Sequence, residues 1–77
     1  MNNAIVSLII QAYHSGLLQN DQVLLVWGYT VSLKLNTRFN VMTIASSGRS
    51  VNTTLWDTDT TEQQETDIAN LFEMVRI

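Results

Sequence analysis

The sequence predicts a two-layer α+β fold: a helix, a three-stranded antiparallel meander and a second helix, in one domain that spans residues 1–77. Three observations support this class. The chain opens with an apolar segment of helical periodicity, continues with alternating apolar and polar side chains between short turns, and closes with an amphipathic stripe. Two helices that flank a meander in this order pack on one face of the sheet, which makes two layers.

The first helix is predicted over residues 3–15. Its apolar side chains cover an arc of roughly 200° on a helical wheel, wider than the stripe of about 100° that a surface helix shows. Gly16 follows at the position of a C-terminal cap. Because no Asp, Glu, Lys or Arg precedes Asp21, we expect this helix to be buried on more than one side, either within the fold or at a subunit contact.

Three strands are predicted in the middle of the chain, from period-two alternation between turn-forming residues. The turn SSGR places Gly48 where a positive φ is expected. The preceding apolar run, residues 22–28, fits either a buried strand or a helical turn, and Gly28 indicates a bulge or kink. The predicted strands are residues 29–35, 39–45 and about 50–56.

The segment LWDTDTTEQQETDI, residues 55–68, contains two sequence patterns associated with catalysis or metal binding. Residues 57–61 match the DxDxT pattern that carries the nucleophile in haloacid-dehalogenase-type phosphatases. In a second reading, ligand positions of a calcium loop are occupied by Asp57, Asp59, Thr61 and Glu65. The phosphatase family needs a much larger domain and a distant lysine, whereas Lys34 is the only lysine here. A calcium loop needs Gly at its sixth and Glu at its twelfth position, where Glu62 and Ile68 stand.

We interpret this segment as the start of the last helix. Thr60 and Gln63 have the spacing of a capping box, and Glu62 and Glu65 fall in the first turns, where carboxylates favourably face the positive end of the helix. An apolar stripe at i, i+3, i+4 and i+7 begins at Ile68. The acidic residues therefore indicate a capped helix with a solvated face, which a partner can also contact.

The composition excludes several classes of site. The absence of cysteine excludes disulfides and thiolate metal sites, and a single histidine, His14, argues against a histidine-based zinc site. The chain has no nucleophile elbow and no Gly-rich phosphate loop, so we expect no enzyme activity and no catalytic, cofactor-binding or metal-ligating residue. No targeting signal is visible and the apolar start is shorter than the ~20 residues of a membrane span, so we expect a cytoplasmic protein without membrane contact.

The order α-β-β-β-α resembles that of the double-stranded-RNA-binding domain. That family contacts phosphates through a lysine-rich start of its last helix and a basic-flanked loop. Here the last helix begins with Asp, Thr and Glu, and the net charge is −3. The resemblance covers element order only, so nucleic-acid binding is expected only as a weak activity of Lys34, Arg38 and Arg49.

The leading hypothesis from the sequence is a small non-enzymatic protein-interaction module that acts by binding another macromolecule, as a homodimer. Its size, its low charged fraction of 14% and its lack of catalytic groups would suit an accessory or inhibitor protein; an origin in a phage or mobile element is a guess that the residues themselves do not show. The alternative is a small-ligand binding module whose pocket lies between subunits and is lined by Trp27, Tyr29, Arg38 and Arg49. The residues predicted to contact a partner are Tyr13, Trp27, Tyr29, Arg38, Arg49, Asp57, Asp59, Glu62 and Glu65.

Overall fold

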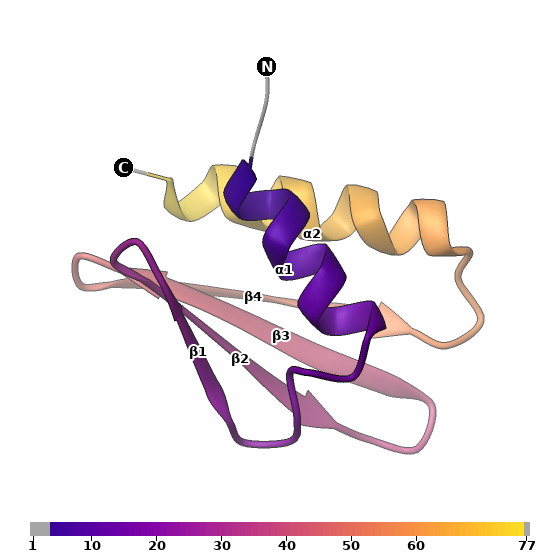
Figure 1. Ribbon diagram of the computed structural model, residues 1–77. Coiled ribbons are helices and arrows are strands. Elements are labelled where there is room, and N and C mark those ends of the chain that lie inside the picture. The colour runs from indigo at the N-terminus through magenta and orange to yellow at the C-terminus, as the bar shows by residue number, and fades with distance from the viewer. Residues whose placement is uncertain (1–3, 77) are drawn as a thin grey trace.

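The computed structural model describes residues 4–76 and shows a four-stranded antiparallel sheet with both helices on one face (Figure 1). The strand order β1-β2-β3-β4 follows the chain, so each strand pairs with its neighbour in sequence. The α+β class and the two layers are confirmed, whereas the prediction of three strands is wrong by one. The elements are α1 (Ala4–His14), β1 (Val23–Val26), β2 (Tyr29–Leu35), β3 (Phe39–Ser46), β4 (Arg49–Trp56) and α2 (Thr61–Val75).

The additional strand, β1, comes from the segment that the sequence left ambiguous between strand and helix. It forms a hairpin with β2 through a two-residue turn in which Trp27 and Gly28 have φ of +45° and +83°. Positive φ at both central residues is typical of type I′ hairpin turns, so Gly28 is a turn residue and not a bulge. The alternation of β1 was hidden because Val23 and Leu25, which point away from the core, are apolar as well.

The first helix corresponds closely to the predicted one. It ends at His14, one residue before the predicted end, and Gly16 follows with φ +78°, as a C-terminal cap requires. Residue 3, where the prediction begins, lies outside the described residues. Neither helix in the described part of the chain is long and apolar enough to cross a bilayer.

The second helix is capped as the sequence predicts. The Thr60 side chain accepts a hydrogen bond of 3.0 Å from the backbone N–H of Gln63. The reciprocal bond of a capping box is replaced, because the Gln63 amide donates to Asp67 at 3.1 Å. The DxDxT pattern, residues 57–61, thus covers the turn after β4, the N-cap of α2 and the first residue of that helix.

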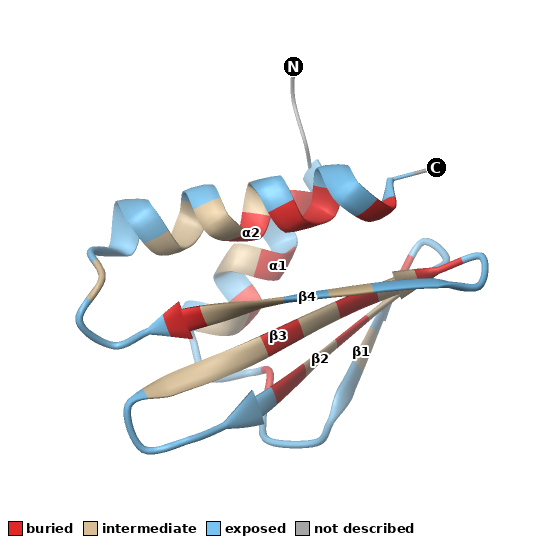
Figure 2. Cartoon of the chain, turned by 180° about the vertical axis from the view of Figure 1, so that it is seen from behind, coloured by how far each residue is buried: buried red, intermediate tan, exposed pale blue. Residues whose placement is uncertain are grey.

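The core lies between the helices and the inward face of the sheet, where Figure 2 shows the buried residues. Tyr29 of β2 and Phe72 of α2 meet at its centre, with ring centroids 4.9 Å apart. Within residues 4–76 no helix lies over the opposite face of the sheet, where Thr, Ser and Asn side chains of β2, β3 and β4 alternate with apolar ones such as Val41 and Ala45. At one end of this open face Phe39 and Trp56 stack at a tilt, 4.9 Å between centroids.

The left-handed conformation of Trp27 leads to a prediction. A bulky residue with positive φ is strained by about 1–2 kcal/mol, whereas Asn is a preferred residue at this position of a type I′ turn. We expect Trp27→Asn to raise the free energy of unfolding by about 0.5–1 kcal/mol in urea denaturation of dilute protein. Trp27→Ala removes the ring but keeps the strained backbone conformation, so it should raise the free energy of unfolding by less than Trp27→Asn does. A loss of stability with Asn would contradict the assignment of Trp27 as a strained, exposed turn residue.

Candidate interaction surface

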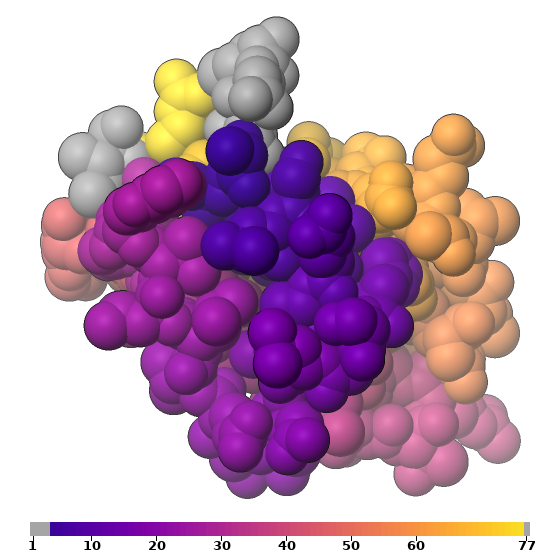
Figure 3. Space-filling model, in the orientation of Figure 1, coloured from indigo at the N-terminus to yellow at the C-terminus, as the bar shows by residue number. Residues whose placement is uncertain are grey.

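Exposed apolar side chains gather around β1, the first edge strand of the sheet. The most exposed of them, Trp27 (74%) and Leu25 (72%), lie on the hairpin, and Leu17 (65%) lies between α1 and β1. Figure 3 shows α1 and β1 side by side on one face of the molecule. We call the following five side chains the β1 apolar surface: Leu8, Leu17, Val23, Leu25 and Trp27.

These side chains form a continuous surface rather than isolated contacts with solvent. Leu8 and Leu17 line one shallow hollow beside the C-terminal half of α1. Leu17 and Val23 line a second hollow, which runs from the end of α1 to the start of β1. Val23 and Leu25 then alternate along the outward side of β1 toward Trp27. Apolar surface therefore extends from α1, around the sheet edge, onto the open face.

The main chain of β1 is also unpaired along its outer edge. Val26 and Tyr29 flank the two-residue turn and form a hydrogen-bonded pair, so the N–H and C=O groups of Val23 and Leu25 point away from β2. No other segment within residues 4–76 hydrogen-bonds to these groups. β1 is thus an exposed edge without charge or proline on it, the kind of edge that pairs with another chain.

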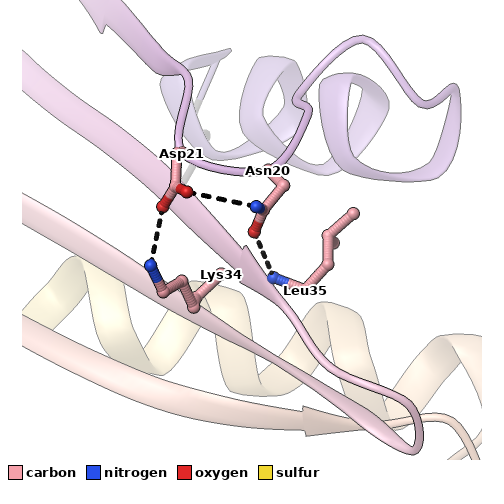
Figure 4. Close-up of polar contacts among 4 residues, drawn as sticks. All are labelled: Asn20, Asp21, Lys34 and Leu35. Carbon is pink, nitrogen blue, oxygen red and sulfur yellow. Dashed lines mark hydrogen bonds and ion pairs between the residues drawn. The ribbon is translucent and has the colours of Figure 1, made fainter.

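A polar network holds the chain at the start of this edge (Figure 4). The Asn20 side chain accepts a hydrogen bond of 2.8 Å from the backbone N–H of Leu35 and donates one to Asp21. Lys34 of β2 donates to Asp21 at 2.9 Å, in an exposed ion pair. These contacts fix the entry of β1 against β2, so the edge is held in place within the single chain. They also engage Lys34, the only charged side chain on the open face among the strand residues.

The three aromatic residues predicted to contact a partner differ in how far they are exposed. Trp27 is exposed on the hairpin. Tyr29 is buried against Phe72 and does not reach the surface of this chain. Tyr13 is half-buried, and its hydroxyl accepts a hydrogen bond of 3.0 Å from Asn40.

The predicted basic contact residues lie at opposite ends of the sheet. Arg38 lies in the turn between β2 and β3, whereas Arg49 begins β4 at the other end and donates to the carbonyl of Met74, near the end of α2. Within one chain, the proposed pocket of Trp27, Tyr29 and both arginines is therefore not assembled, since Arg38 is remote from the rest. Lys34, Arg38 and Arg49 likewise form no single basic patch.

The acidic residues predicted to contact a partner gather at the β4–α2 turn and the first turns of α2. Asp57 and Asp59 serve the turn through their backbone N–H groups, which donate to the carbonyls of Arg38 and Trp56. No group of three or more His, Asp or Glu side chains in residues 4–76 is placed to hold a metal ion. Glu62 and Glu65 follow on α2, so these four carboxylates mark one acidic end of the molecule.

A cavity of about 640 Å³ lies between the end of α1, the end of β2 and the start of β3. Its size suits a small ligand, but most of its polar groups already have partners. Asn40 donates to Tyr13, the Asn20 amide bonds Leu35 and Asp21, and Gln64 donates to the carbonyl of Trp56 at 2.7 Å. The cavity is thus a structural cleft whose hydrogen bonds join the elements around it.

No protein-family model matches the chain, and no curated protein or solved structure is significantly similar to it.

Sequence reasoning missed Val23, Leu25 and Leu8 as surface residues. The signal was present in the run VLLVW, where both alternating positions are apolar although a tight turn follows directly. In a short edge strand of a sheet with one covered face, such a run places apolar side chains on the open side.

The capping role of Thr60 can be tested by truncation. Removing the hydroxyl that accepts from Gln63 leaves a backbone N–H without its cap, so Thr60→Ala should lower the free energy of unfolding by about 1 kcal/mol. Thr58→Ala, at an exposed position of the same turn, is the matched control and should change stability by less than about 0.5 kcal/mol. Equal losses in the two variants would show that the cap is assigned to the wrong residue.

Proposed function

We propose that the protein is a small non-enzymatic interaction module that acts by binding another protein through the β1 apolar surface. The observation that carries this proposal is the coincidence of three exposed apolar side chains, Val23, Leu25 and Trp27, with an unpaired strand edge. Large exposed apolar patches on soluble domains mark interaction sites, and a Trp within such a patch is a frequent source of binding energy.

The hydrogen-bonding pattern supports a protein as the partner rather than a small molecule. An exposed strand edge offers alternating N–H and C=O groups that another strand satisfies, while the side chains of alternate residues provide specificity. Val23 and Leu25 each combine outward-facing N–H and C=O groups with an exposed apolar side chain. A nucleic acid is disfavoured here because the β1 apolar surface contains no basic side chain.

A site-specific photocrosslinker tests this function. A benzophenone amino acid replaces Trp27 in one variant and Trp56, which is exposed at the opposite end of the sheet, in a matched control. On irradiation in the native host, we expect position 27 to form adducts with protein, detected as bands of raised mass, and position 56 to form far fewer. The absence of any protein adduct at position 27, including one with the same chain, would overturn the proposed function.

A further inference from the structure

We propose that the protein seated on the β1 apolar surface is a second copy of this chain. Two β1 strands pair antiparallel about a twofold axis, so that two four-stranded sheets become one continuous sheet of eight strands. This inference rests on the proposed function, in which that surface docks a protein, and adds the identity and geometry of the partner. Antiparallel pairing of identical edges is self-complementary, as a twofold interface requires.

The unpaired groups on β1 determine the register. Val23 and Leu25 are the two residues of this strand whose N–H and C=O groups face outward. Antiparallel pairing therefore sets Val23 of one copy opposite Leu25 of the other, with the twofold axis at Leu24. Two residues with one donor and one acceptor each satisfy all their outward groups in this arrangement.

We call the line along which the two β1 strands pair the seam. The side chains that flank the seam are apolar on both faces of the sheet. On the open face, Val23 and Leu25 of both copies come together as cross-strand pairs. On the helical face, Leu8 and Leu17 of the two copies approach one another, because α1 lies on the β1 side of the molecule. The pairing thus brings exposed apolar side chains of the two copies into contact with one another.

The charge distribution selects β1 over the other edge, β4. Six of the seven acidic residues lie between positions 57 and 73, on α2 and the turn before it, and α2 packs over β3 and β4. Pairing of two β4 edges would bring two acidic helices side by side, and like charges repel. Pairing at β1 keeps these helices at the outer ends of the assembly, while residues 4–20 and 22–33 carry no Asp, Glu, Lys or Arg.

The area that a stable interface needs requires α1 and the hairpin to take part in the proposed contact. A stable protein interface buries about 800 Å² on each partner, roughly one sixth of the 4850 Å² of accessible surface here. A strand of four residues is too short to supply this area alone. Leu8 and Leu17 on one side and Trp27 at the end of the strand extend the contact, so the whole β1 apolar surface belongs to the interface.

The mass in solution tests the proposal, measured by sedimentation equilibrium from about 1 µM to about 1 mM protein, the range of weak to moderate association. We expect wild-type chain to pass from 8.7 kDa to twice that mass, 17.4 kDa. Leu25→Lys should weaken dimerisation at least about tenfold, since it replaces apolar cross-strand contacts with two like charges on neighbouring strands. Met74→Lys, at an exposed apolar position of α2, adds the same charge and should leave dimerisation unchanged.

A second variant and a second readout test the pairing itself. Val23→Pro removes an outward N–H at the first residue of an edge strand, a position that tolerates proline, and should also weaken the dimer at least about tenfold. In hydrogen exchange, the amides of Val23 and Leu25 should become protected as wild-type concentration rises, and those of Ser50 and Asn52 on the β4 edge should not. Circular dichroism of each variant verifies that the monomer remains folded.

The outcomes separate this inference from the proposed function. A wild-type chain that stays at 8.7 kDa throughout overturns the second copy as the partner; adducts of position 27 with a different protein would then still uphold the docking function. A dimer that persists in Leu25→Lys and Val23→Pro, or that protects the amides of β4, overturns the β1 seam. A dimer lost in both variants and kept in Met74→Lys supports it.

Discussion

Two helices are all that the described chain has to cover one face of a four-stranded sheet, and the rest of the structure depends on this constraint. A helix is about 10 Å wide and strands lie about 4.8 Å apart, so each helix covers about two strands. α2 lies over β3 and β4 and reaches β2 through the contact of Phe72 with Tyr29. α1 alone remains for the other side, and the edge strand β1 lies at the limit of its coverage.

The separation of charge follows the same division of the molecule. α2 packs against the sheet with one narrow stripe, so the rest of its circumference is free for carboxylates and amides. α1 has apolar residues around more than half of its circumference, and Leu8 remains exposed although Val6 and Ile9 are buried. The α2 side of the protein is thus charged and solvated, while the β1 side presents apolar surface whose flanking charges, Asp21 and Lys34, pair with each other.

The parts of the fold that followed from the sequence are those in which one face of an element is buried and the other solvated. β2 alternates between core residues and polar ones, and α2 is capped by Thr60, the residue before it, so both were predictable. β1 was not, because Val23 and Leu25 are apolar although they point away from the core. Period-two alternation identifies a strand only when one of its faces is apolar and buried and the other is polar and solvated. In β1 both faces are apolar, and its exposed face belongs to the surface that we propose binds protein.

The arginines show a second limit of sequence reasoning. Arg38 lies in one turn of the meander and Arg49 directly follows the next. Consecutive turns alternate between the ends of the sheet, so topology separates the two arginines. Arg49 then binds the carbonyl of Met74, a partner 25 residues away that only the tertiary fold brings near. Charge counting along the chain finds such residues, but their partners depend on the packing of helix against sheet.

Trp27 connects the local conformation of the hairpin with its proposed role. A tryptophan with positive φ is strained by about 1–2 kcal/mol, and its exposed ring gains little from the fold of a single chain. A tryptophan buried in an interface contributes about 2 kcal/mol or more to binding. We propose that burial of the ring against a partner offsets this strain. The same turn also ends β1 after four residues, which keeps the unpaired edge short.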